Sequence, residues 1–175
     1  MPQADTLADR FVVQVHDSPA HIAAAAWNTL LAAQPAPNPF MRHEYLLALH
    51  ESNSAVARSG WIPQFITLQQ RGNLAAACAV YLKRHSYGEY VFDWAWADAY
   101  QRHGLAYYPK LLGAVPFTPV PGTRLLATDG AARARLAQVI TDLARSAQLS
   151  SAHLLFIDDA DQADEDRPEH VPDAA

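Results

Sequence analysis

Apolar residues recur at helical spacing after Asp129, which predicts an amphipathic helix near the end of the chain. The apolar stripe comprises Ala132, Leu136, Val139, Ile140, Leu143, Ala144 and Ala147. Thr128 and Asp129 precede the stripe, and both residue types cap the first turn of a helix. We therefore expect a capped helix whose apolar face packs on a sheet.

Shorter patterns predict the elements of the N-terminal third. Residues 11–16 are rich in valine and predict a strand. Ser18 and Pro19 then start an alanine-rich segment that we expect to be helical to about Ala33. Prolines interrupt the next stretch, and helical spacing returns at 40–51, where we expect a second helix.

The middle of the chain predicts antiparallel strands. Residues 64–70 and 74–83 read as a hairpin around the turn Arg71-Gly72-Asn73. Further along we expect a third strand of the same set at 89–94, a short helix at 96–102, an extended irregular segment at 109–121, and strands at 122–127 and 153–157.

Charge is distributed unevenly along the 175 residues. Residues 158–175 hold eight acidic residues and one basic residue, whereas the rest of the chain holds ten acidic and twelve basic residues. We therefore expect a single domain at 1–157 and an acidic tail at 158–175. The nearly neutral body lacks the basic field with which proteins gather phosphates, so we expect no DNA or RNA partner.

The single cysteine, Cys78, lies in an apolar run, which predicts a buried thiol and excludes a disulfide framework. His43 and His50 are seven residues apart, whereas two ligands on one helix face require four, so we expect no metal site. No apolar run approaches the ~20 residues of a membrane span, and the N-terminus does not resemble a signal peptide. We expect a soluble, cytoplasmic protein.

Aromatic residues are concentrated between Tyr81 and Tyr108, far above the 10% of the whole chain. The rings are Tyr81, Tyr87, Tyr90, Phe92, Trp94, Trp96, Tyr100, Tyr107 and Tyr108. They alternate with the ionisable residues Lys83, Arg84, His85, Glu89, Asp93, Asp98, Arg102, His103 and Lys110. Such a mixture suits the binding of a polar molecule, although aromatic residues are also common as core anchors of strands.

Two of these residues are candidates for catalysis. Asp93 lies between two aromatic residues, where desolvation raises the pKa of a carboxyl toward that of a general base. Alternatively, it is a structural acid paired with Lys110 or Arg102. Tyr108 can orient a substrate carbonyl, or its ring can pack under the following proline.

The other candidates are for substrate binding. Lys83 and Arg84, at the end of the predicted hairpin, can hold a carboxylate or phosphate, or can simply be solvated. The remaining members of the set are Trp94, Trp96, Tyr100, Tyr107 and Lys110.

Several short segments resemble one known family. They are Asn38-Pro39-Phe40, His43-Glu44-Tyr45-Leu46, Phe92-Asp93-Trp94, Trp96-Ala97, Ala99-Tyr100, Gly104, Tyr107-Tyr108-Pro109-Lys110-Leu111, Pro116-Phe117-Thr118-Pro119, Gly122 and Arg124-Leu125-Leu126. Together with the order of elements they are similar to the FemAB-like family of peptidoglycan biosynthesis or recognition proteins, within the GNAT acyltransferase superfamily. The resemblance spans about 12–157 and matches the first of two tandem domains.

This resemblance implies a GNAT-like α+β fold, with a mixed, mainly antiparallel sheet flanked by helices. It also implies an acyl- or aminoacyl-transferase domain that acts on an amine of a cell-wall precursor. The alternative is a non-catalytic binding or dimerisation module that recognises a peptide or glycan. If the second domain is missing, the apolar surface of this domain that would face it is exposed. Such a surface predicts a homodimer or partial aggregation.

The acyl donor is left open. GNAT folds hold the pyrophosphate of coenzyme A on free N–H groups at the start of a helix. The corresponding turn here, residues 126–133, has a single glycine and places the Asp129 carboxylate where phosphates would lie. The sequence therefore departs from the family pattern at the position expected to bind acetyl-CoA.

Overall fold

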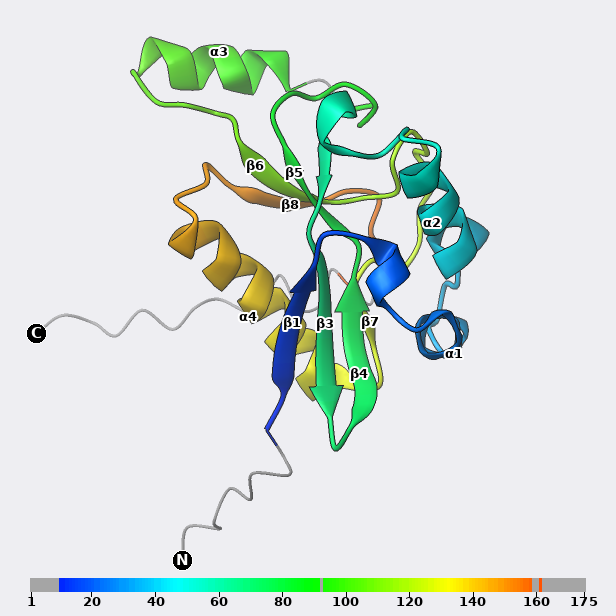
Figure 1. Ribbon diagram of the computed structural model, residues 1–175. Coiled ribbons are helices and arrows are strands. Elements are labelled where there is room, and N and C mark those ends of the chain that lie inside the picture. The colour runs from blue at the N-terminus through cyan, green and yellow to red at the C-terminus, as the bar shows by residue number, and fades with distance from the viewer. Residues whose placement is uncertain (1–9, 92, 159–160, 162–175) are drawn as a thin grey trace, which may run out of the picture.

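A computed structural model describes residues 10–91, 93–158 and 161 (Figure 1). Sheet A has the strand order β1-β3-β4-β7, and sheet B has the order β2-β5-β6-β8. The strands are β1 (Val12–His16), β2 (Trp61–Pro63), β3 (Phe65–Gln70), β4 (Asn73–Cys78), β5 (Val80–Lys83), β6 (Lys110–Gly113), β7 (Leu126–Ala127) and β8 (Ala152–Leu154). The helices are α1 (Ala24–Ala32), α2 (His43–Glu51), α3 (Trp94–Arg102) and α4 (Gly130–Ser146), with short 3-10 helices at Pro19–His21, Pro39–Met41 and Ala57–Ser59.

The predicted fold class is confirmed. Strands pair antiparallel in both sheets, except that β6 and β8 run parallel. Helices flank the strands, as expected for an α+β acyltransferase-like fold. The strand predicted at 74–83 is divided, because β4 pairs in sheet A and β5 pairs in sheet B, with Ala79 between them.

Different helices cover the two faces of sheet A (Figure 1). Ile66 and Leu68 pack in one cluster with Leu136 and Ile140 of α4. On the other face, α1 contributes Trp27 and Leu30, α2 contributes Leu46 and the 3-10 helix before α2 contributes Met41 to a second cluster. Because successive side chains of a strand point to opposite faces, the buried strands β3 and β4 supply both clusters.

Helix α4 agrees with the sequence pattern. The Asp129 carboxylate accepts a hydrogen bond from the Ala132 amide at 2.8 Å and caps the helix. Five residues of the predicted stripe are buried, namely Ala132, Leu136, Val139, Ile140 and Ala144. The free thiol of Cys78 is also buried, as predicted.

The two predicted N-terminal helices are each interrupted. A 3-10 helix at Pro19–His21 is separated from α1 by extended backbone at Ile22, whose side chain enters the core. Extended backbone at Arg42 likewise separates Pro39–Met41 from α2. Helical spacing persists across these breaks, which is why the sequence does not reveal them.

The third strand was predicted in the wrong place. The described residues of 89–94 form no strand, since Tyr90 has a left-handed φ of 58° and Trp94 begins α3; Phe92 lies outside the described residues. On the side away from β2, β5 pairs with β6, in a segment expected to be irregular. The strands expected at 122–127 and 153–157 are shorter, as β7 and β8, and β2 was not predicted.

Helix α3 was predicted correctly, apart from starting two residues earlier. It lies at one end of the molecule beyond sheet B, and none of its residues is buried (Figure 1). Gly104 follows its end with a φ of 70°, which suits glycine after a helix.

Two residues of the expected acidic tail contact the domain. Asp161 is fully buried, and its carboxylate accepts hydrogen bonds from the amides of Arg124 and Leu125. Asp158 accepts hydrogen bonds from the Thr123 hydroxyl and from the Asp161 amide. The boundary at 157/158 stays a prediction, and the rest of the tail lies outside the described residues.

Candidate functional site

The site is built on two lysines that lie directly opposite each other. The antiparallel register of β5 and β6 pairs Lys83 with Lys110. Their side chains are 0% and 1% exposed, so two ammonium groups are removed from water on the same face of the sheet. Like charges in this arrangement repel, and the fold is stable only if carboxylates lie between or beside them.

Glu89 and Asp93 supply those carboxylates. The Lys110 ammonium donates to Glu89 Oε2 at 2.8 Å and to Asp93 Oδ2. Lys83 Nζ lies 3.9 Å from Glu89 Oε1 and donates to the Tyr87 carbonyl at 3.0 Å. We call Lys83, Glu89, Asp93 and Lys110 the buried charge cluster; its four formal charges cancel.

The members of the cluster differ in how firmly they hold their charge. Burial lowers the pKa of Lys83 to about 8, although the nearby Glu89 carboxylate opposes the shift. Burial also acts to lower the pKa of Lys110, but the hydrogen bonds to Asp93 and Glu89 outweigh it and raise that pKa above its ordinary value. Burial raises the pKa of Glu89 against the opposing effect of Lys110. Lys110 is therefore the fixed cation of the site.

Aromatic rings surround the two ammonium groups. Lys83 Nζ lies 3.6 Å from the ring centroid of Trp61, its cross-strand neighbour on β2. Lys110 Nζ lies 5.4 and 5.7 Å from the ring centroids of Tyr107 and Tyr108. Burial raises the pKa of Tyr107 to about 12 and also raises that of Tyr108, so both phenols stay protonated and can donate hydrogen bonds.

A pocket of about 300 Å³ adjoins the cluster, and we call it the aromatic pocket. It is lined by Ser86, Tyr87, Gly88, Tyr90, Val91 and Trp94. The three rings are largely exposed, and none of the described lining residues is charged. The pocket thus offers aromatic faces and a hydroxyl, and its lining residues are adjacent in sequence to Glu89 and Asp93 of the cluster.

The loop that forms this pocket is clamped. The Gly88 carbonyl accepts a hydrogen bond from the Phe117 amide at 3.1 Å. A Cβ at Gly88 would lie 2.6 Å from the Phe117 ring, and the φ of 81° there also favours glycine. Tyr90 and Phe117 both have a φ of 58°, a costly conformation for aromatic residues that persists only where the surroundings enforce it.

The structure brings together most of the predicted site residues. Lys83, Asp93 and Lys110 are members of the buried charge cluster, and the rings of Tyr107 and Tyr108 lie beside Lys110. Asp93 forms the ion pair with Lys110 that was one of its two predicted alternatives.

Three other predicted residues lie further out. Arg84 is exposed, and the Tyr100 ring contacts Tyr107 with centroids 5.1 Å apart. Trp96 is 65% exposed and is not among the lining residues of the aromatic pocket, whereas Trp94 is. The role of each predicted residue in binding or catalysis stays a prediction.

Sequence reasoning missed Glu89 and Trp61 as members of the site. The sequence shows Glu89 as an acidic residue between two tyrosines. Only the pairing of Lys83 with Lys110 shows that a second carboxylate, besides Asp93, is required to balance the two buried ammonium groups. Trp61 lies on β2, which no pattern in the sequence indicated.

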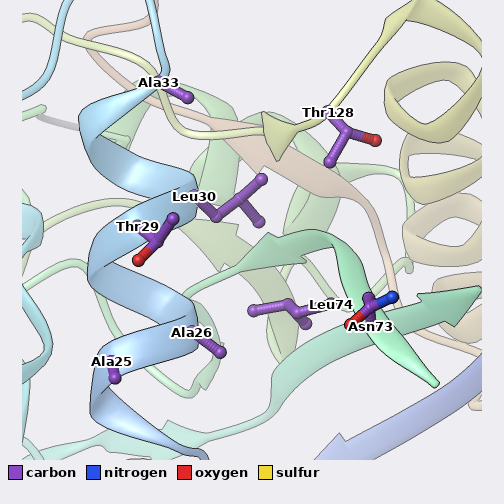
Figure 2. Close-up of a pocket in the computed structure, with 8 residues that line it drawn as sticks. All are labelled: Ala25, Ala26, Thr29, Leu30, Ala33, Asn73, Leu74 and Thr128. Atoms are coloured by element: carbon purple, nitrogen blue, oxygen red, sulfur yellow. The ribbon is translucent and has the colours of Figure 1, made fainter.

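A larger pocket of about 480 Å³ lies on sheet A, away from the charge cluster (Figure 2). Helix α1 provides one wall, and the start of β4 and Thr128 provide the other. The lining residues are Ala25, Ala26, Thr29, Leu30, Ala33, Asn73, Leu74 and Thr128. None of these described lining residues has an ionisable side chain, so they offer no acid or base for catalysis.

The start of α4 does not fit the pyrophosphate of coenzyme A. The Asp129 carboxylate already accepts a hydrogen bond from the Ala132 amide, and its negative charge occupies the positive end of the helix dipole. Nothing lies within 4 Å of a Cβ built on Gly130, so no close approach requires glycine there. The structure therefore supports the departure from the GNAT pattern that the sequence predicted.

The structure describes residues 10–91, 93–158 and 161. In this part of the chain, no group of three or more His, Cys, Asp or Glu residues is placed to hold a metal ion. Among the same residues, no helix combines the length and the apolar character that a membrane span requires.

Comparison with known proteins identifies one family. The family model of FemAB-like proteins, described as peptidoglycan biosynthesis/recognition, matches residues 18–171. Comparison with curated proteins gives no significant match, and comparison with solved structures gives none either.

Proposed function

The chain belongs to the FemAB-like family, and on this premise we propose that its aromatic pocket binds the peptide or glycan part of a peptidoglycan precursor. The observation that carries this proposal is the grouping of Tyr87, Tyr90 and Trp94 around one uncharged pocket. Exposed aromatic faces pack against the apolar faces of sugar rings and against peptide side chains. The volume of about 300 Å³ suits one sugar unit or a few residues of peptide.

The clamped loop supports binding by reducing its entropic cost. Lys83 donates a hydrogen bond to the Tyr87 carbonyl, Lys110 to the Glu89 carboxylate, and the Phe117 amide to the Gly88 carbonyl. A loop that is already ordered loses little conformational freedom when a ligand binds. The buried charge cluster therefore stabilises the loop that forms the pocket.

Trp94 and Trp96 provide a matched test of this proposal. Both are exposed tryptophans of α3, at 68% and 65%, but only Trp94 lines the pocket. We expect Trp94→Ala to weaken binding of a soluble disaccharide pentapeptide by about 10- to 30-fold, as for a central aromatic contact, and Trp96→Ala to change it little. Isothermal titration calorimetry measures both dissociation constants. Equal affinities for the wild type and Trp94→Ala would place the ligand elsewhere, and no heat at all would refute the function.

Acyl or aminoacyl transfer to an amine is a second candidate function. It is favoured because Asp93 and Tyr108 both lie next to the buried Lys110. Asp93 forms an ion pair with Lys110, and the centroid of the Tyr108 ring lies 5.7 Å from Lys110 Nζ. In this proposal the amine attacks the acyl carbon of an activated ester or thioester, Asp93 accepts the amine proton and the protonated Tyr108 stabilises the oxyanion. The bond from the acyl carbon to the leaving oxygen or sulfur then breaks, and the leaving group takes up the proton from Asp93. We derive no step through coenzyme A, because the start of α4 does not fit it. The buried free thiol of Cys78 agrees with a reducing cytoplasm as the compartment.

Asp93→Asn separates the two candidates. If Asp93 is the base, we expect this variant to lose at least about 100-fold in turnover of an amine acceptor while its affinity for the disaccharide pentapeptide stays within twofold, because the amide still accepts a hydrogen bond from Lys110. Turnover is measured by mass spectrometry of the acylated acceptor, and folding by thermal denaturation. If the wild type binds but transfers nothing, the domain is a binding module.

A further inference from the structure

Ser151 and His153 form a close polar pair at the beginning of β8. Their Oγ and Nε2 atoms lie 2.7 Å apart. Residues i and i+2 of a strand share a face, so the backbone of β8 itself holds this pair together. Ser150 is also near, with its Oγ 3.3 Å from Ser151 Oγ, but it donates to the carbonyl of Tyr107.

The pair lies beside the buried charge cluster. The parallel register of β6 and β8 pairs His153 with Leu112, which places the imidazole on the face that carries Lys110. The His153 ring also meets the Tyr107 ring at a centroid distance of 6.4 Å.

These neighbours set the protonation of the imidazole. Burial lowers the pKa of His153, the Lys110 ammonium lowers it further, and the Asp93 carboxylate opposes the shift. His153 is therefore neutral at neutral pH. In the tautomer with its proton on Nδ1, Nε2 accepts the hydroxyl proton of Ser151.

The edge of sheet B offers a donor for a developing oxyanion. The Ser151 carbonyl accepts from the Leu111 amide, and the Leu155 amide donates to the Gly113 carbonyl, so these alternate residues of the last strand face β6. Ala152 lies between them, is exposed, and by alternation directs its N–H away from β6. The N–H that follows a nucleophile is a common oxyanion donor.

We propose that Ser151 is a nucleophile, activated by His153, that takes an acyl group from an activated ester or thioester. Ser151 Oγ forms a bond to the acyl carbon, and the bond from that carbon to the leaving oxygen or sulfur breaks. His153 Nε2 removes the hydroxyl proton and returns it to the leaving group, so the step needs no further reactant. The Asp93 carboxylate favours the imidazolium that forms between these two transfers, whereas burial and the Lys110 ammonium act against it and keep it short-lived. This acyl-serine site is independent of the proposed peptidoglycan function.

The full chain is tested with p-nitrophenyl acetate, which does not resemble peptidoglycan. We expect release of p-nitrophenolate together with one acetyl group on Ser151, located by peptide mass spectrometry. Ser151→Ala should abolish the adduct, and His153→Gln should slow its formation by about 100-fold, the lower range for loss of a general base. Ser146→Ala is the control, because it removes an exposed serine hydroxyl of α4 that bonds to the Leu143 carbonyl and not to Ser151 or His153; its rate should stay within twofold.

Two additional measurements keep a loss of folding from mimicking the result. Ser151→Cys restores a nucleophile at the same position and should again be acylated in a His153-dependent manner. The rate in the wild type should rise with pH and reach half its maximum below about pH 6.5, because the neutral imidazole is the active form. An adduct on any other residue, no adduct, or an unchanged rate in His153→Gln overturns the proposal.

Discussion

Replacement of Lys110 by methionine is expected to lower the free energy of unfolding by about 3–5 kcal/mol, the cost of breaking a buried ion pair from one side. Lys110 bonds to both Glu89 and Asp93, and all three side chains are almost completely buried. Methionine fills a similar volume but leaves Asp93 without its cation and Glu89 with Lys83 alone, 3.9 Å away. Chemical denaturation followed by tryptophan fluorescence measures the change.

Arg102→Met is the matched control for this prediction. Arg102 also forms an ion pair, with Asp98, but the two side chains are 69% and 62% exposed. Exposed pairs contribute only about 0–1 kcal/mol, so this variant should unfold almost like the wild type. If Lys110→Met lowered the free energy of unfolding no more than Arg102→Met, the charge cluster would not stabilise the loop that forms the pocket.

Replacement of Asp161 by alanine is expected to have the second largest effect, on the order of 3 kcal/mol. The buried carboxylate accepts hydrogen bonds from the amides of Arg124 and Leu125, and each buried N–H left without a partner costs about 1–3 kcal/mol. Equilibrium denaturation of the full chain measures the loss. The result would show that a residue beyond Ile157 stabilises the domain.

Asp161→Asn distinguishes the hydrogen bonds of Asp161 from its charge. Asparagine retains one oxygen acceptor for the two amides but has no negative charge, so we expect it to recover part of the lost stability. A surface control is Asp142→Ala, which removes an exposed carboxylate of α4 and should cost less than about 0.5 kcal/mol. Equal stability of Asp161→Ala and Asp142→Ala would mean that the packing of Asp161 does not stabilise the fold.

The candidate site was predictable in its residue types but not in its arrangement. The stretch between Tyr81 and Tyr108, dense in rings and charges, contains three of the four members of the buried charge cluster and the described residues that line the aromatic pocket. It did not indicate that Asp93 would share Lys110 with Glu89, nor that Trp94 and Trp96 would differ in their relation to the pocket. Those distinctions depend on how α3 and the preceding loop lie on sheet B.

Ser151 and His153 illustrate the same limit. They lie far along the chain from the aromatic cluster, and the sequence predicted only a strand at 153–157, which includes His153 but not Ser151. The parallel pairing of β8 with β6 brings them beside Lys110 and Tyr107. No local pattern in the sequence encodes that pairing.

The sequence alone determined the features that depend on near neighbours. Helix α4 with its Asp129 cap, strand β1 and the turn at Arg71-Gly72 follow from periodicity, capping and backbone preference within a few residues. The tertiary structure alone decided that β4 and β5 enter different sheets, that β6 rather than 89–94 pairs with β5, and that Lys83 faces Lys110. Pairing between distant strands is chosen by burial and charge balance over the whole fold, because many registers are compatible with the same local pattern.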